Sequence, residues 1–124
     1  MNSTKTFLML GALLAGIGVA TGAFGAHGLK SMVTADRLAV FETAVRYQMY
    51  HAFAILFVGM LMQSRSGLDL SLAGWLFLAG IVLFSGSLYV LVLADMRSLG
   101  MITPLGGVAF IAGWLVLAWR VWRA

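Results

Sequence analysis

Charged residues are so sparse in this sequence that they leave four long, uninterrupted, uncharged runs. A helix needs about 20 residues, with a range of roughly 17 to 25, to cross the ~30 Å hydrocarbon core of a bilayer, and each run is long enough. The runs are continuously apolar rather than alternating, which argues against the strands of a transmembrane barrel. We therefore expect an all-α integral membrane protein, a four-helix transmembrane bundle that forms a single transmembrane domain. The expected spans are approximately residues 6–27, 46–63, 70–94 and 103–120.

The composition supports lipid as the solvent of this chain. Of its 124 residues, 62% are hydrophobic and 10% are charged, whereas soluble domains are about half apolar and a quarter charged. A soluble domain of this size would expose larger apolar patches than a monomer tolerates. The net charge of +4 comes from eight scattered Lys and Arg residues, so membrane lipid, and not nucleic acid, is the expected partner. The absence of cysteine excludes disulfides and thiol chemistry.

Several residues predict where helices begin. Thr34 is expected to cap a helix that starts before the second span, over an amphipathic segment at 35–45. This segment either extends the second helix beyond the bilayer or lies along the membrane surface. Glu42 and Arg46 are four residues apart within it and can pair on one helical face. Thr103, which precedes the only proline, is expected to cap the last helix.

Small residues recur near one face of the first run and again in the last two runs. In lipid, small residues let helix backbones approach closely, and dispersion packing replaces the missing hydrophobic drive. Packing within the bundle is the main interpretation, and the alternative is a homo-oligomer interface or a contact with a partner membrane protein. The residues expected to serve helix packing are Gly11, Ala15, Gly18, Gly22, Gly25, Gly86, Gly106, Gly107 and Gly113.

Most polar residues of the runs gather at one membrane face. With four spans, the first and third helices end at this face, and the second and fourth begin there. Polar groups at membrane depth are costly and often functional, so we expect a polar site at this face. The candidate residues are His27, Glu42, Arg46, Tyr47, Gln48, His51, Tyr89, Asp95 and Thr103.

His51 is the most informative of these residues, because it lies about one turn inside the second span. An unpaired polar group there would cost several kcal/mol. The main interpretation is a histidine satisfied by a hydrogen bond across the bundle, and the alternatives are a proton relay, a ligand contact or an axial ligand to haem. His27 is the only other histidine and is expected at a helix end, which gives weak support for haem or a metal. No cofactor and no metal are therefore expected. Asp95 is expected to pair with Arg97 or with a cation from the neighbouring loop.

No set of catalytic residues is evident in the sequence. A nucleophile elbow, a phosphate-binding loop and a carboxylate pair inside the membrane are all missing, so the chain is not expected to be an enzyme. Lys and Arg residues divide four against four between the two membrane faces, which leaves the orientation open.

Four segments, at residues 22–29, 41–51, 85–89 and 102–107, the last followed by Gly113-Trp114, resemble a small family of unknown function. This family contains the bacterial inner-membrane protein YgdD. The resemblance implies a multi-pass protein of the bacterial inner membrane and carries no established activity. Three functions remain as hypotheses, and the third of them is an enzyme or redox subunit that holds a cofactor. The first is non-enzymatic binding of a lipid, small molecule or partner subunit at the polar face, and the second is a small oligomeric transporter or channel with His51 in its pathway.

Overall fold

The computed structural model describes residues 2–124, and every regular element in this part of the chain is a helix. The first two helices are long, and the third long stretch is divided into an α-helix, a π-helix and a second α-helix. Two short 3₁₀ turns lie in the connections. In chain order the elements are α1 (Ser3–Ala26), η1 (Leu29–Ser31), α2 (Ala35–Ser64), α3 (Ser71–Gly80), the π-helix η2 (Ile81–Gly86), α4 (Ser87–Leu93), η3 (Arg97–Met101) and α5 (Thr103–Arg123).

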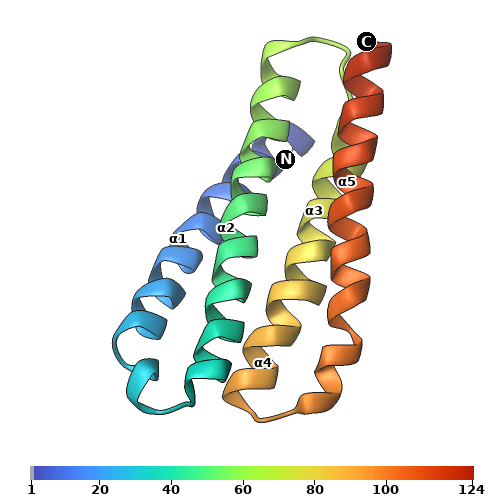
Figure 1. Cartoon of the computed structure of the whole chain (residues 1–124). Coiled ribbons are helices and arrows are strands. Elements are labelled where there is room, and N and C mark those ends of the chain that lie inside the picture. Colours follow the sequence, from blue (N-terminus) through green and yellow to red (C-terminus); the bar gives the residue numbers. More distant parts are fainter. Residues whose placement is uncertain (1) are drawn as a thin grey trace.

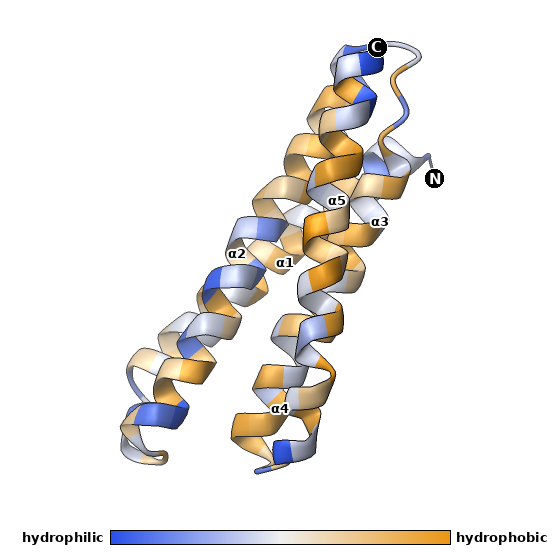
Figure 2. Ribbon diagram, turned by 45° about the vertical axis from the view of Figure 1, so that its right-hand side comes forward, coloured by the Kyte–Doolittle hydropathy of each residue, from blue (hydrophilic) through white to orange (hydrophobic). Residues whose placement is uncertain are grey.

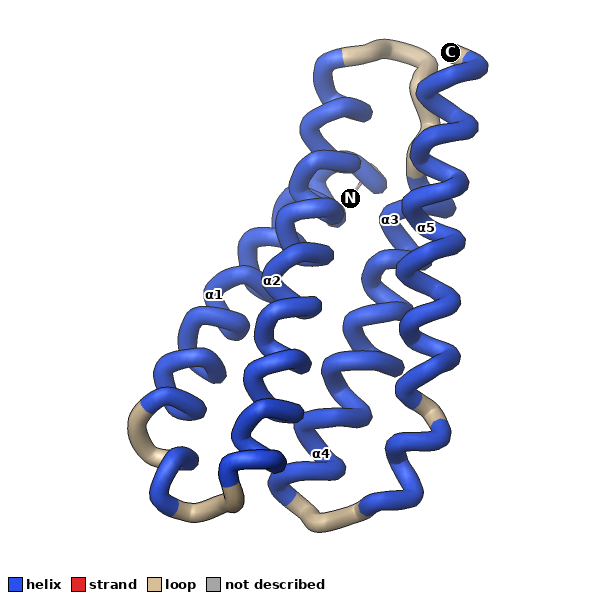
Figure 3. Tube along the Cα trace, viewed as in Figure 1, coloured by secondary structure: helices blue, strands red, loops and turns tan. Residues whose placement is uncertain are grey.

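The chain runs back and forth along one axis of a helical bundle (Figure 1). Both termini and the loop at 65–70 lie at one end, which we call the terminal end. The connections at 27–34 and 94–102 lie at the opposite end, which we call the loop end. Figure 3 shows that all these connections are short. Neighbouring segments are therefore antiparallel, and the two ends of the bundle are made of different parts of the chain.

Three helical stretches are long and apolar enough to cross a membrane. They cover Ser3–Ser31, Ser71–Leu93 and Arg97–Arg123, and α2 is not among them. The expectation of four comparably apolar spans is therefore wrong for α2. The reason is that α2 carries charged residues in its first half and Gln48 and His51 in its middle, and these residues lower its hydropathy. Figure 2 shows hydrophilic turns along the half of α2 that lies toward the loop end.

The helix starts agree only in part with the sequence-based predictions. The Thr34 side chain caps α2 by accepting a hydrogen bond from the Arg37 backbone N–H at 3.3 Å. The amphipathic segment at 35–45 is continuous with the rest of α2 and is not a separate surface helix. Thr103, by contrast, is not the cap of α5, because Ile102 occupies that position. The 3₁₀ turn η3 leads directly into α5, and the Thr103 hydroxyl lies 3.4 Å from the Leu99 carbonyl and only 2.6 Å from the Ser87 hydroxyl.

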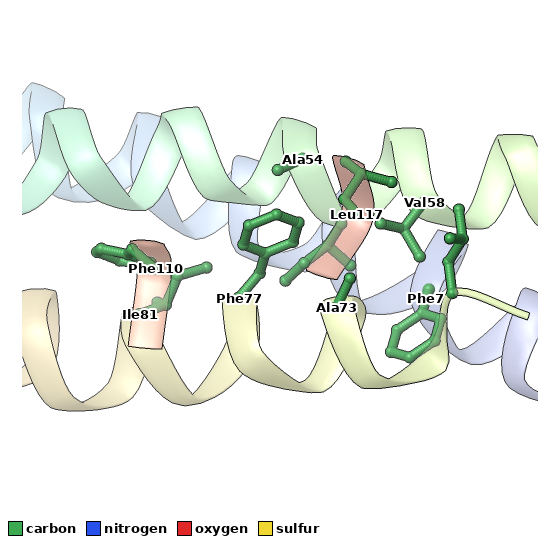
Figure 4. Packing of buried hydrophobic residues seen from close by; sticks show 10 residues of the cluster. Phe7, Ala54, Val58, Ala73, Phe77, Ile81, Phe110 and Leu117 are labelled. Carbon is green, nitrogen blue, oxygen red and sulfur yellow. The ribbon is translucent and has the colours of Figure 1, made fainter. Parts of the chain in front are cut away.

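The main core lies between α2 and α3 and extends to α5 (Figure 4). Phe77 of α3 is fully buried there, and Phe110 and Leu117 from one face of α5 are nearly so. A smaller core near the loop end joins Leu29, Phe41 and Val92. Because lipid tails are as apolar as these side chains, close packing and dispersion rather than burial from water hold such cores together.

Several glycines permit this close packing. A Cβ on Gly11 would lie 2.6 Å from the Leu56 side chain, and one on Gly18 would overlap the Met49 side chain. Positions Gly22, Gly25 and Gly113 also face side chains of a neighbouring helix within 3.3 Å.

Gly106 makes the tightest approach to a neighbouring backbone. A Cβ there would overlap the backbone nitrogen and Cα of Phe84. Of the other expected packing positions, Ala15 is half-buried, Gly86 faces only a carbonyl 3.9 Å away, and Gly107 faces open space.

Candidate functional site

The His51 imidazole is hydrogen-bonded on both of its nitrogens inside the bundle. The Trp114 indole Nε1 donates to His51 Nε2 at 3.1 Å, and Nδ1 lies 2.8 Å from the Tyr47 carbonyl oxygen. An indole N–H can only donate and a carbonyl can only accept, so Nε2 is the unprotonated nitrogen and Nδ1 carries the hydrogen. This geometry assigns a neutral imidazole in one tautomer.

Aromatic rings from three helical segments enclose the same imidazole. The Phe110 ring stacks on it with the centroids 3.6 Å apart and the planes 10° apart. Phe77 packs at 5.7 Å and Tyr47 at 6.3 Å between centroids, and only 5% of the His51 surface is exposed. His51 therefore joins α2 to α3 and α5, and its two nitrogens are already in use.

A second polar contact joins α1, α2 and α4. The Gln48 amide Nε2 donates to the Leu14 carbonyl of α1 at 2.8 Å, and its Oε1 accepts from the Tyr89 hydroxyl of α4 at 2.5 Å. The hydroxyl of Thr21, whose own donor bonds reach carbonyls of α1, lies 3.5 Å from the Tyr89 hydroxyl. Gln48 is almost completely buried, and both polar atoms of its amide have a hydrogen-bond partner.

Serine hydroxyls make two further links near the π-helix. Ser85 of η2 is fully buried and donates to the Ala44 carbonyl of α2 at 2.7 Å. Ser87 lies 2.6 Å from the Thr103 hydroxyl of α5 and donates to the Phe84 carbonyl at 2.9 Å. A π-turn is rare in a helix and is often found at a functional site. Here the π-turn lies between α2 and α5: Ser85 within it bonds to α2, and Ser87 directly after it contacts the Thr103 hydroxyl of α5.

One ion pair closes the loop end of the bundle. Arg37, in the first turn of α2, pairs with Asp95 after α4, and its other guanidinium nitrogen donates to the Leu91 carbonyl at 3.3 Å. Of the two expected pairings of Asp95, the one with Arg97 is wrong, and the partner is instead a cation just after the neighbouring loop at 27–34. Asp95 has a positive φ of 56°, a left-handed conformation that turns the chain after α4 and that, after glycine, aspartate and asparagine tolerate best.

Replacing Asp95 with asparagine is expected to lower the free energy of unfolding by less than about 1 kcal/mol, because the ion pair is exposed and screened. The Asp95 side chain is 76% exposed and that of Arg37 is 23% exposed. Asp95→Ala should lower the free energy of unfolding more, by roughly 1–2 kcal/mol, because alanine also disfavours the left-handed backbone conformation. Detergent-induced unfolding at low and high salt measures both variants. A salt-independent loss in Asp95→Asn, or equal losses in the two variants, would contradict this account.

The remaining polar candidates do not join the groups above. His27 caps α1 through its backbone and is exposed at the loop end, and Glu42 and Arg46 are exposed on α2. The expected Glu42–Arg46 pair does not form, since the single ion pair within residues 2–124 is Arg37–Asp95. A surface pair of this kind stabilises a helix by only about 0.2–0.5 kcal/mol, too little to hold both side chains in place.

The nine candidate residues therefore lie in separate groups at different depths rather than in one site. Sequence reasoning missed Trp114 and Ser85 as hydrogen-bond partners, and it missed Arg37 as the partner of Asp95. Trp114 lies within the motifs that carry the family resemblance, but no residue near it in the sequence indicates that it bonds to His51. Within residues 2–124, no group of three or more His, Asp or Glu residues is placed to hold a metal ion.

A groove of about 430 Å³ opens between α3 and α5 at the terminal end. Its lining consists of Leu72, Val116, Trp119, Arg120 and Arg123. The Arg123 guanidinium lies 5.4 Å from the centre of the Trp119 ring, a cation–π distance. The groove thus combines an apolar floor with two guanidinium groups at a bundle end where both chain termini lie.

One acidic side chain lies near this groove. Hydrogen bonds from the hydroxyl and backbone N–H of Ser71 lower the pKa of Asp69, and attraction to Arg120 acts in the same direction. Asp69 is therefore ionised at neutral pH. No ion pair joins it to Arg120 within the described part of the chain, so the guanidinium keeps its donors.

Helices apolar enough to span a bilayer, joined by short loops, define the chain as a multi-pass α-helical membrane protein. Within this class it belongs to the family described as "Protein of unknown function (DUF423)", which matches residues 21–107. A UPF0382 membrane protein of Staphylococcus aureus (strain bovine RF122 / ET3-1) is 52% identical over 113 residues, which cover 91% of this chain and 92% of the relative. UPF0382 membrane protein YwdK of Bacillus subtilis (strain 168) is 50% identical over 114 residues, covering 91% and 93%. No solved structure matches the chain.

The relatives agree with a multi-pass bacterial membrane protein and name no activity. Membership in an uncharacterised membrane family is what the resemblance implied, while the particular likeness to YgdD stays a prediction. All nine polar candidates lie within the residues that the family matches.

Proposed function

We propose that α2 crosses the bilayer together with the three apolar helices. The chain path supports this, because α1 and α3 both begin at the terminal end and the chain must return there between them (Figure 1). Close contacts of Gly11 and Gly18 with α2 support it as well. Gln48 and His51, which lower the hydropathy of α2, have their hydrogen bonds satisfied within the bundle, so they add little cost in lipid.

We further propose that the chain is a non-enzymatic membrane protein that binds the headgroup of an anionic phospholipid. The observation that carries this proposal is the groove at the terminal end. Guanidinium groups bind phosphate through paired hydrogen bonds, and Arg120 and Arg123 both line the groove. Leu72 and Val116 supply an apolar floor for an acyl chain, and Trp119 is a residue type that favours the membrane interface.

This proposal moves the binding site away from the polar face that the sequence indicated. The polar side chains of Gln48, His51 and Tyr89 already hydrogen-bond within the bundle, so they are not free to hold a ligand. The same geometry weighs against a transport path through His51. A proton relay needs a nitrogen free to exchange protons along a path, and both nitrogens of this ring are bonded within the bundle.

The double variant Arg120→Gln/Arg123→Gln tests the lipid proposal. Native mass spectrometry compares retention of phosphatidylglycerol and phosphatidylcholine that carry the same acyl chains. We expect the wild type to prefer phosphatidylglycerol. The double variant should weaken that binding by about 30-fold, since each cation near an anionic surface contributes about 1 kcal/mol.

Arg97→Gln is the matched control, because Arg97 is exposed at the opposite end of the bundle. It should keep the lipid preference of the wild type. An equal affinity for the two lipids, or an equal loss in the control, would overturn the proposal. Displacement of the bound lipid by millimolar inorganic phosphate would also overturn it and reassign the groove to free phosphate.

A further inference from the structure

The face of α2 that points away from the bundle carries a continuous exposed stripe. Tyr50, Phe53, Phe57 and Met60 are each more than half exposed on this face, while the opposite face of α2 is buried. We call this face the outer α2 stripe. Its members are Ala39, Glu42, Arg46, Tyr50, Phe53, Phe57 and Met60.

Two members of the stripe are charged and lie inside the bundle's apolar length. Arg37 marks the loop end through its pair with Asp95, and Arg46 follows nine residues later, about 13 Å further along the helix at 1.5 Å per residue. Phe24 of α1 and Tyr89 of α4 both pack against Phe41, next to Glu42, and at this level Phe24 and Val90 are exposed apolar side chains. A charged side chain facing hydrocarbon is costly and is almost always paired or turned toward protein.

The two charges have no ion-pair partner in the part of the chain that the structure describes. Glu42 and Arg46 are both exposed, and neither takes part in an ion pair among residues 2–124. Nor does the glycine face of α1 offer an interface to another copy, because Gly18 and Gly22 are already covered by α2 side chains. The surface that remains to be covered is therefore the outer α2 stripe itself.

The spacing of the stripe fits a second, parallel copy of the same helix. Ala39, Arg46, Phe53 and Met60 follow one another at intervals of seven residues, the repeat that lets two helices stay in contact along a seam. Two copies inserted in the same direction are related by a two-fold axis along the membrane normal, which places each residue opposite itself.

Helical side chains lean toward the helix N-terminus, so Arg46 reaches toward the level of Glu42, one turn earlier. A two-fold axis makes this contact reciprocal and gives two ion pairs. We propose that the outer α2 stripe is the interface of a parallel homodimer, in which Arg46 of each copy pairs with Glu42 of the partner subunit. The dimer removes both charges from lipid and covers the exposed aromatic residues beside them. This inference is independent of the lipid proposal.

Charge reversal tests the reciprocal pairing. The full chain is labelled for energy transfer between copies and reconstituted in phosphatidylcholine vesicles over a range of lipid-to-protein ratios. The wild type should dimerise, and Glu42→Arg and Arg46→Glu should each raise the dimer dissociation constant by about tenfold or more. The double variant Glu42→Arg/Arg46→Glu should recover the wild-type constant, and Arg97→Glu, off the stripe, should leave it unchanged.

A cysteine scan tests the interface without altering any charge, so it remains decisive if a reversed variant fails to fold. The sequence has no cysteine. Phe53→Cys, on the stripe, should form a covalent dimer on oxidation, whereas Leu13→Cys, on the exposed side of α1, should not. A monomeric wild type at every lipid ratio, a double variant no tighter than the single ones, or equal cross-linking at both positions would overturn the proposal.

Discussion

Replacing Gly106 with alanine should lower the free energy of unfolding of the bundle by about 3 kcal/mol or more. The added Cβ would overlap the backbone nitrogen and Cα of Phe84, and a backbone cannot rotate away as a side chain does. Forcing an extra methyl into a packed interior typically costs about 1–3 kcal/mol, and this site lies at the upper end. Unfolding in increasing dodecyl sulfate, followed by far-ultraviolet circular dichroism, measures the change.

The neighbouring residue is a matched control for this substitution. A Cβ on Gly107 meets no atom within 4 Å, so Gly107→Ala should leave stability unchanged or raise it by up to about 1 kcal/mol through helix propensity. If the two alanine variants unfold at the same dodecyl sulfate concentration, the close approach of α5 to η2 does not stabilise the bundle.

The second large effect is expected at His51. Replacing it with alanine should lower the free energy of unfolding by about 3 kcal/mol. The substitution removes a ring that stacks on Phe110 and leaves a cavity, as truncation of a buried aromatic does. It also removes the acceptor of the Trp114 indole N–H. The same unfolding measurement applies. If His51 only lined a transport path, the substitution would instead abolish transport and leave the free energy of unfolding unchanged.

A pair of phenylalanine variants separates the polar part of this loss from the packing part. His51→Phe keeps a ring of similar size and leaves the Trp114 N–H unpaired, at a cost of about 1–3 kcal/mol. Adding Trp114→Phe removes the unpaired donor and should recover most of that loss. Strictly additive losses in the double variant would show that the hydrogen bond contributes nothing to stability.

The helical architecture could be predicted from the sequence because its causes are local. Apolar runs of sufficient length, the cap at Thr34 and the spacing of charges follow directly from the order of residues. The weaker apolarity of α2 was also present in the composition of residues 35–64, but the absence of charge in its second half concealed it. Counting charges alone gives Gln48 and His51 the same weight as leucine, whereas their transfer to hydrocarbon is costly.

The partners of the polar residues could not be predicted, because each depends on how distant helices pack. Trp114 follows His51 by 63 residues, and the contact between Ser85 and Ala44 spans 41. The sequence left the partner of Asp95 open between Arg97 and a cation from the neighbouring loop, and only the packing of α2 against α4 selects Arg37. The left-handed backbone of Asp95 accompanies its pairing with α2, and no local sequence rule indicates it.

The π-helix between α3 and α4 shifts the angular position, around the helix axis, of the residues that follow it. Each residue of an α-helix advances about 100° around the axis, and a π-turn holds one residue more than an α-turn. The side chains beyond Gly86 therefore point in the directions they would have in an unbroken α-helix with one residue fewer. A regular 3.6-residue count carried through residues 71–93 assigns Tyr89 and Val92 to the wrong side, about 100° from where they lie. A homologue one residue shorter at this turn could present the same side chains to α2 and α5 through an unbroken α-helix.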